Sequence, residues 1–565
     1  MLYKRIEDGL MVESECEPEF SLSCELLVAG LGTAGAIAVI SGAKAGLDTI
    51  GVEALGSMGG TGTAGCVWDY SWGNPGGQFE EIDRRAQEFG ERFLLHTGQP
   101  GSELGSRYIH GSAKSYALAK EAENAGCRLI FNTYITGVFV DGNSICGVEC
   151  VGINGKFNIS VGAVIDSTGD LIVVRSFGLP THSSPDAVRM NFSKTMVVMN
   201  DTLARNYAAP CGTRTSELSD DLILSEKLID VGSKPGFLRD KWSASNRIII
   251  SGELPGYRDS ERIHGLSEIS LMSIFSPESS FEPLFYAFSP IDHVGGDMLE
   301  APFELKLWRI GLKLRGFGLN IPIPIGTLIP EGIDNLLVAG KGISISDELT
   351  GCLRMKKDME KFGEAAAVIA SIMIRNHQKA CDVRVSDVRE KLRASGCLSD
   401  HAEPVICRVN GFMDRTPIIP PQNRDELIAL LSSPGSGALA ILALKGEFDP
   451  SRLDDIDLPE LSVQKAIIYG VLGLFGRPVP DNVLRTLYSL ATEPVSNNNS
   501  PAGDGEDLRD PDMLMPAAAV WILGELKDAG SIGTLEALVN AYSECRPTRA
   551  NMFMKELCKK ALQSF

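Results

Sequence analysis

Three glycines near the amino terminus have the spacing of a phosphate-binding loop. Gly30, Gly32 and Gly35 form the pattern G-x-G-x-x-G directly after an apolar run at residues 26–28. The first glycine permits a tight turn, the second lets a pyrophosphate approach the backbone, and the third lets a helix pack closely on the strand. A helix expected over residues 34–46 begins at this turn, so its free amide groups and positive dipole end face the phosphates.

An acidic residue completes the pattern. Glu53 follows a predicted strand at residues 49–52 and lies 18 positions after Gly35, where a carboxylate can accept hydrogen bonds from ribose hydroxyls. A glycine-bearing turn in an ordinary α/β core explains the glycines, but not Glu53 or the glycine pair that follows it. The sequence therefore predicts dinucleotide binding. The expected contacts are Gly30, Gly32, Thr33, Ala34, Gly35, Glu53, Ala54, Gly59, Gly60 and Thr61.

Further segments resemble the motifs of one protein family. The run EALGSMGGT at 53–61 is similar to the acid-to-glycine-pair segment of flavoprotein oxidoreductases, and AVIDSTGD at 163–170 is similar to their second cofactor motif. RDSERIHG at 258–265, NLLVAGK at 335–341, GCLRM at 351–355 and FGEAAA at 362–367 follow in order. Over about residues 20–395 the chain thus resembles FAD-dependent oxidoreductases distantly related to fumarate reductase flavoproteins.

The resemblance implies that the dinucleotide is FAD. The glycine pair would run along the pyrophosphate towards the flavin, and the backbone near Ile135 would meet the adenine. A helix expected over residues 358–375, with its start near Gly363, would direct amide groups at the pyrimidine edge of the flavin and so stabilise the reduced cofactor. The further expected cofactor contacts are Ile135, Thr168, Gly169, Asp170, Gly340, Gly363 and Ala365.

The resemblance also suggests catalytic residues. Arg258, Arg262 and His264 lie in the insert where relatives keep their substrate domain, and an arginine beside a flavin can hold a carboxylate or an oxyanion with two hydrogen bonds. A surface helix with charged residues is the alternative. His293, next to an acidic residue, is a candidate proton carrier or a structural histidine. Arg354 is expected to serve the cofactor or a substrate carboxylate.

The segment after the glycine pair is expected to pass beside the flavin ring. Cys66, Trp68 and Tyr70 are therefore candidates to line the active site, and aromatic packing under a loop is the alternative. Elsewhere the chain departs from the family. Isoleucine and glycine replace a tyrosine and an arginine at 325–326, Glu261 replaces an arginine, Asp347 falls where relatives often have histidine, and KKD occupies 356–358. The cofactor side is thus expected to be intact and the substrate side to have diverged.

These motifs need an α/β fold to position them. We predict a Rossmann-like FAD-binding domain with an inserted α+β substrate domain, followed by an all-α region that resembles HEAT-like repeats. The predicted boundaries are 1–184 and 321–400 for the FAD-binding domain, 185–320 for the substrate domain and 401–565 for the helical region. The repeat interpretation depends on three similar apolar helices at 438–446, 466–476 and 517–530, and an ordinary helical appendage is the alternative.

Composition limits the partners and the compartment. A formal net charge of −20 argues against a nucleic-acid-binding surface and against binding to anionic membranes. Thirteen scattered cysteines and an amino terminus without a continuous apolar core favour the cytoplasm. No metal-binding motif is evident. We expect a small polar substrate, an unidentified electron partner and a protein partner for the helical region.

Three functions are compatible with the sequence. The first is hydride transfer between FAD and a small polar molecule. The second is reduction of an activated double bond, as in fumarate reductases. The third is a flavoprotein fold that is retained as a scaffold for protein interaction, which the arginine missing at Gly326 and the helical repeats favour.

Overall fold

The computed structural model divides the chain into two compact units. Unit 1 comprises Met1–Ser270, Phe281–Gly295 and Asn320–Glu403. Unit 2 comprises Leu271–Ser280, Gly296–Leu319 and Pro404–Phe565. The predicted domain boundaries stay a prediction, since compactness alone does not show independent folding. The structure describes residues 1–93, 108–185, 191–199, 204–214, 222–223, 225–226, 247–276, 282–292, 297–410, 414–495, 514–545 and 548–565.

Unit 1 contains the predicted parallel sheet. Its strands lie in the order β16 (Leu336–Val338), β8 (Gly155–Asp166), β3 (Leu22–Ala29), β4 (Thr49–Val52) and β5 (Arg128–Ile130), and each neighbouring pair is parallel. The central strands are continuous apolar runs with buried side chains, as is typical of a parallel sheet covered on both faces. All the carboxyl ends, where the predicted cofactor motifs begin, therefore lie along one edge.

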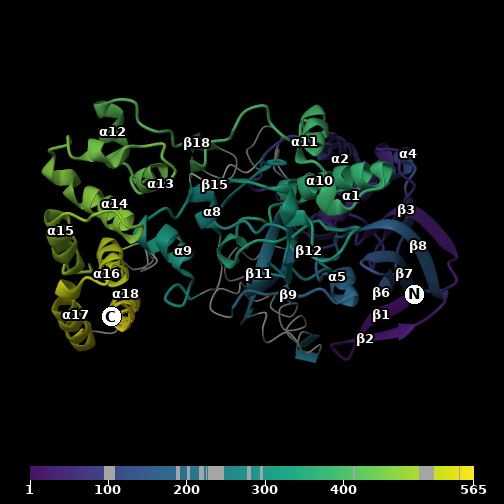
Figure 1. The fold of residues 1–565 in the computed structure, drawn as a ribbon, viewed down its shortest axis with the longest axis horizontal. Coiled ribbons are helices and arrows are strands. Elements are labelled where there is room, and N and C mark those ends of the chain that lie inside the picture. The colour runs from purple at the N-terminus through teal and green to yellow at the C-terminus, as the bar shows by residue number, and fades with distance from the viewer. Residues whose placement is uncertain are drawn as a thin grey trace. The chain divides into compact units, whose positions relative to one another are not determined.

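The same sheet continues as an antiparallel half. It adds β7 (Ser144–Gly152), β6 (Tyr134–Asp141), β1 (Leu2–Glu7) and β2 (Leu10–Glu15) beside the first half of β8 (Figure 1). The run Asp141-Gly142-Asn143 predicts a hairpin turn, and this prediction is confirmed, because Asp141 pairs with Ser144. β8 thus pairs with β7 over its first residues and with β16 over its last.

Helices cover the parallel half. α1 (Thr33–Lys44) follows the first glycine turn and packs on α10 (Lys356–Asn376), and the two lie together in Figure 1. α4 (Gly111–Ala125) also packs on α1 and on α2 (Phe79–Phe93). The helix expected over residues 358–375 forms as α10, but it begins at Lys356, so the expected placement of Gly363 at its start is wrong. Gly363 lies inside the helix, where a Cβ atom would overlap the carbonyl oxygen of Ala34.

The part of the chain predicted as an α+β insert contains short strands in unit 1. One sheet has the order β11 (Ala204–Arg214), β10 (Asn191–Met199) and β12 (Arg247–Ser251). The run RIIIS at 247–251 predicts a strand from its sequence, and β12 confirms it. β13 (Arg262–Ile263) pairs with β9 (Thr181–His182). A helix expected at 216–231 lies largely outside the described residues.

Unit 2 is mainly helical, but not entirely. β17 (Ile406–Val409) pairs with Phe317–Leu319, the part of β15 (Phe317–Pro322) that lies in this unit, and with β18 (Arg415–Pro417). The all-α description of residues 401–565 is therefore wrong at its start. The helices that follow are α12 (Arg424–Leu431), α13 (Ala438–Leu444), α14 (Ser462–Leu474), α15 (Asp481–Ala491), α16 (Met515–Glu525), α17 (Ile532–Glu544) and α18 (Arg549–Gln563).

The core of unit 2 includes two segments that precede residue 320. Phe275 stacks on Trp308, with ring centroids 6.5 Å apart, and Phe303 lies 5.5 Å from Trp521 in α16. α14, α15 and α16 pack on one another, and α18 packs on α16 and α17. Among the described residues, no helix combines the length and the apolar character needed to cross a membrane.

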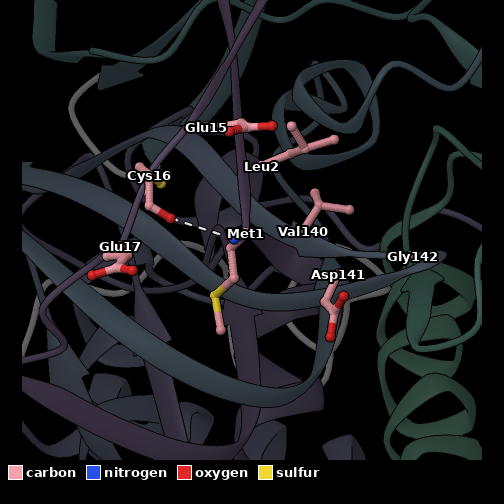
Figure 2. Close-up of a pocket in the computed structure, with 8 residues that line it drawn as sticks. All are labelled: Met1, Leu2, Glu15, Cys16, Glu17, Val140, Asp141 and Gly142. Atoms are coloured by element: carbon pink, nitrogen blue, oxygen red, sulfur yellow. Dashed lines mark hydrogen bonds between the residues drawn. The ribbon is translucent and has the colours of Figure 1, made fainter.

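A cavity of about 520 Å³ opens beside the amino-terminal hairpin (Figure 2). The Met1 ammonium donates to the Cys16 carbonyl at 3.4 Å. The residues that line the cavity also include Glu15, Glu17 and Asp141, and none of the predicted site residues is among them. This cavity is therefore separate from the predicted cofactor motifs.

The close contact between α1 and α10 can be tested at Gly363. Gly363→Ala should lower the free energy of unfolding by roughly 1–3 kcal/mol through overpacking, although alanine alone favours a helix by about 1 kcal/mol. Gly533→Ala is the control, because a Cβ atom there meets nothing within 4 Å, and it should be neutral or stabilising. Denaturant unfolding followed by circular dichroism measures both. An unchanged midpoint for Gly363→Ala would contradict the close packing.

Candidate cofactor and substrate site

The first glycine turn leaves a bare backbone surface at the start of α1. Gly30 has φ +78° and donates its amide to Val52 at 2.8 Å. A Cβ atom on Gly30 would lie 2.7 Å from the Ser167 oxygen, whereas a Cβ atom on Gly32 would meet nothing within 4 Å. No side chain caps α1, whose first backbone bond runs from Ala36 to Gly32. The preceding amides are therefore open to an anionic ligand.

The second glycine turn packs directly on the first. Gly59 has φ +100° and donates its amide to Leu31 at 2.8 Å. Gly60 has φ +52°, and a Cβ atom there would lie 2.8 Å from the Cα of Gly32. Thr33 Oγ1 donates to the Gly59 carbonyl at 3.3 Å. The two turns thus form one surface of backbone atoms, and Thr61 is exposed at its end.

Glu53 connects the first glycine turn to the segment that leads to the second glycine turn. Its carboxylate accepts the Leu31 amide at 2.6 Å and the Leu55 amide at 2.9 Å. Burial raises the pKa of Glu53, while backbone amides of residues 55, 31 and 54 oppose that rise. A carboxylate has about four acceptor positions, so the group can bind both amides and still accept ribose hydroxyls.

Asp166 ends β8 and organises the second cofactor motif. One carboxylate oxygen accepts the Thr168 amide at 3.1 Å and the Thr168 hydroxyl at 2.7 Å. The other accepts the amides of Val173 and Val174 in α5 (Ile172–Phe177) at 2.9 and 3.1 Å. Asp166 lies in the run AVIDSTGD, but this role depends on contacts that the sequence alone does not predict. It fixes the loop that carries Thr168, Gly169 and the exposed Asp170.

The third cofactor motif, NLLVAGK at 335–341, lies beside the second. Ala339 donates its amide to the Asp166 carbonyl at 3.1 Å, and Gly340 follows with φ +119°. Both motifs therefore meet the first glycine turn at the carboxyl edge of the sheet. The open amides, the bare glycine surface and the acceptor Glu53 fit the phosphates and ribose of a dinucleotide.

The segment RDSERIHG at 258–265, together with Tyr257 before it, lies beside Lys341 and Gly342 at the end of the third cofactor motif. Lys341 Nζ donates to the Tyr257 carbonyl at 2.5 Å, and the Ile263 amide donates to Gly342 at 3.0 Å. Burial lowers the pKa of Lys341 to about 8, the charges of Asp170 and Asp259 oppose this, and Arg354 adds to it. The structure therefore places Tyr257 and Ile263 beside the third cofactor motif, and the catalytic roles expected for Arg258 and His264 stay predictions.

Arg262 has its hydrogen bonds inside the protein. Its side chain is 1% exposed and donates to the Ile345 carbonyl at 3.1 Å, to Ser184 at 3.0 Å and to the carboxylates of Asp259 and Asp347. The surface-helix alternative is thus wrong for Arg262, which lies in β13. Its partners indicate a structural residue that fixes this segment, and its catalytic role stays an untested prediction.

The other candidates lie nearer to solvent. Arg258 is half-buried, and His264 is exposed with its ring 4.8 Å from that of His182. Arg354 donates to the Asp292 carboxylate at 2.6 Å, while its Nε is buried without a hydrogen-bond partner among the described residues. His293 lies outside the described residues.

Five further predicted residues have buried positions. Ile135 lies in β6, and Ala365 lies with Gly363 in the interior of α10. Trp68 packs with Cys66 in a buried cluster. Their contacts with a cofactor or a substrate remain predictions.

A model of the family described as FAD dependent oxidoreductase matches residues 25–226 and 235–392. The match covers more than half of the chain, which therefore belongs to this family and is an FAD-dependent oxidoreductase with a small-molecule substrate. No curated protein matches in a sequence search.

Comparison with solved structures finds several that match this chain at low identity and low TM-score. A geranylgeranyl bacteriochlorophyll reductase-like protein from Thermoplasma acidophilum has 12% identity and a TM-score of 0.37, over 82% of this chain and 96% of its own. The anhydrotetracycline hydroxylase OxyS from Streptomyces rimosus has 10% identity and a TM-score of 0.34, over 81% and 77%. The p-nitrophenol 4-monooxygenase PnpA from Pseudomonas putida has 10% and 0.35, over 66% and 87%. Likeness at this level transfers no activity to the present chain.

The role of Glu53 predicts a defect in cofactor affinity. Glu53→Gln has one acceptor oxygen and leaves one buried amide facing an NH₂ group, at a cost of roughly 1–3 kcal/mol. The dissociation constant of FAD should rise about fivefold to more than a hundredfold, as measured by flavin fluorescence on apoprotein. Glu25→Gln is the control, since Glu25 accepts an exposed amide at 2.8 Å. Equal affinity for Glu53→Gln would refute the role.

The network of Arg262 predicts a stability defect. Arg262→Met leaves two carboxylates without their partner, and breaking a buried pair costs about 3–5 kcal/mol. Flavin release on heating should therefore occur at a clearly lower temperature. Arg384→Met removes an exposed pair with Asp387 and should change little. A variant of Arg262 with normal thermal release and no turnover would instead support a catalytic role.

Proposed function

We propose that this FAD-dependent oxidoreductase transfers a hydride between the flavin and a small polar substrate that carries an anionic oxygen. FAD, when bound, supplies the hydride acceptor or donor. The observation that carries the proposal is the buried Nε of Arg354, which has no partner among the described residues. A buried donor left without a partner costs roughly 1–3 kcal/mol, so a ligand oxygen that accepts this bond is favoured.

The position of Arg354 supports a substrate role. Its guanidinium is oriented by Asp292 through the 2.6 Å bond and by the Asp292 carbonyl at 3.4 Å. Its charge acts on Lys341, which is the last residue of the third cofactor motif. A fixed guanidinium holds a carboxylate or an oxyanion in one orientation, which is what hydride transfer requires. We assign Arg354 to orient the substrate.

Arg258 is proposed to assist from the neighbouring segment. It follows Tyr257, whose carbonyl is bound by Lys341, and it precedes Asp259, which is bound by Arg262. Tyr257 on one side of Arg258 is therefore bound to the third cofactor motif, and Asp259 on the other side is bound to the buried Arg262. A guanidinium on this anchored loop can stabilise charge that develops on the substrate oxygen during the reaction.

The cofactor residues bind and orient FAD. We propose that the amides before Ala36 bind the pyrophosphate, that Glu53 accepts the ribose hydroxyls, and that the turn at Gly59–Thr61 leads to the flavin. Thr168, Gly169, Asp170 and Gly340 line the cofactor from the adjacent strand ends.

A second candidate is reduction of an activated double bond, as in fumarate reductases. The exposed ring of His264 beside His182 favours it, because such a reaction needs a proton carrier at the surface of the site. Alkene reduction by the reduced protein, lost in His264→Ala, would separate this candidate from the first.

The helical part of unit 2 is proposed to be HEAT-like and to bind a protein partner in the cytoplasm. Successive packing of α14, α15 and α16 supports stacked repeats. In the scaffold hypothesis the helical region binds the partner protein and the flavin-binding fold carries out no redox reaction. Flavin that no reductant bleaches would favour the scaffold.

The proposal predicts that Arg354→Met and Arg258→Ala keep the flavin spectrum and lose most reduction by substrate. Loss of one charge-assisted contact costs about 1.5–3 kcal/mol, or roughly tenfold to a hundredfold in the reduction rate. Arg258→Lys should recover little, because lysine cannot form the two-pronged contact. Anaerobic flavin bleaching with a panel of hydroxy acids measures the rates, and Arg384→Met is the control. Wild-type rates would exclude either arginine, and loss of FAD would reassign it to the cofactor.

A further inference from the structure

Ionisable side chains from four segments meet inside unit 1, behind the second glycine turn. Lys114 in α4 donates to Glu360 in α10 at 2.7 Å and to Asp83 in α2. The Tyr70 hydroxyl donates to Glu360 Oε1 at 3.1 Å and lies 3.4 Å from Asp83. Glu360 is 1% exposed, and its Oε2 has no hydrogen-bond partner among the described residues. The cluster thus places one cation, Lys114, against two carboxylates, and one oxygen of Glu360 is left without a hydrogen bond among the described residues.

Lys356 lies at the edge of this cluster. Its ammonium is buried, lies 3.9 Å from the centroid of the Tyr70 ring and donates to the Val67 carbonyl. No carboxylate in the described parts of the chain is within 4.0 Å of it. Lys356 is therefore a buried amino group that contacts a ring and a carbonyl and has no carboxylate directly beside it among the described residues.

Its position relates it to the proposed cofactor path. A Cβ atom on Gly62 would lie 3.5 Å from Lys356 Cδ and 3.8 Å from its Nζ. Gly62 ends the short helix η1 (Gly60–Gly62) that continues the second glycine turn. Lys356 is also the first residue of α10, so negative charge arriving here would meet a side-chain cation and the positive end of a helix dipole.

Lys356 can change its charge near neutral pH. Burial lowers its pKa to about 7, the charges of Glu360, Asp69 and Asp83 oppose this, and Lys114 adds to it. Burial likewise raises the pKa of Glu360. The groups that face Lys356 thus come from α10, α2, α4 and the loop with Asp69 and Tyr70.

We propose that Lys356 binds one proton when the flavin is reduced, and that its ammonium balances the negative charge of the reduced cofactor. This rests on the proposed cofactor path past Gly62. The step balances: the substrate gives a hydride to the flavin and a proton, through solvent, to the Lys356 amine. The products are the oxidised substrate, anionic reduced flavin and the Lys356 ammonium.

The test is the pH dependence of the flavin reduction equilibrium in the holoprotein, measured with reference dyes between about pH 7.5 and 8.5. Each proton bound shifts this equilibrium tenfold per pH unit, or about 30 mV for a two-electron couple. The wild type should show a hundredfold change per unit, for two protons. Lys356→Met and Lys356→Arg should show a tenfold change, because arginine is already charged. Only the methionine variant should also be harder to reduce.

Lys357→Met is the matched control, since Lys357 is the half-buried neighbour of the same charge, and it should behave as the wild type. A tenfold change in the wild type, or a hundredfold change in Lys356→Met, would overturn the inference. The inference would also be overturned if Lys356→Met and Lys356→Arg lost the flavin while the wild type and Lys357→Met kept it, because Lys356 would then be a residue that binds the cofactor. Wild-type protein without FAD would instead refute the proposed cofactor site itself.

Discussion

Backbone-to-backbone packing around the first glycine turn is the constraint on which unit 1 depends. The turn touches the end of β8 at Ser167, the second glycine turn at Gly60 and the helix α10 at Gly363. A Cβ atom at Gly30, Gly60 or Gly363 would overlap or crowd one of these contacts. Three segments distant in sequence are thus fixed relative to one surface, and that surface is where phosphates are expected.

Charged groups buried against backbone complete this arrangement. Glu53 binds two amides, Asp166 binds three amides and a hydroxyl, and Lys341 binds a carbonyl. Each contact replaces a hydrogen bond to water that the charged group loses when it is buried. These groups therefore hold loops in place at the cofactor edge, and the same geometry leaves Glu53 able to accept further hydrogen bonds.

Local patterns carried most of the correct predictions. The apolar runs, the glycine spacing and the turn after Asp141 depend on neighbours in sequence, so the strands and α1 could be predicted closely. Contacts between distant residues could not. Arg262 meets Asp347, and Lys114 meets Glu360, only in the folded chain, so the sequence showed the arginine as a catalytic candidate and gave no sign of the buried cluster. The helix expected over residues 358–375 begins two residues earlier, at Lys356, whereas β17 and β18 were missed because they are short.

The position of β16 and α10 late in the chain has a consequence for biosynthesis. α1 ends at Lys44, but its packing partner α10 is complete only at Asn376. At roughly 5–20 residues per second, the ribosome exposes the apolar face of α1 for roughly 15–65 seconds before that partner emerges. The nascent chain must therefore carry an uncovered nucleotide-binding half through the synthesis of the whole insert, and this interval is where a chaperone would engage it.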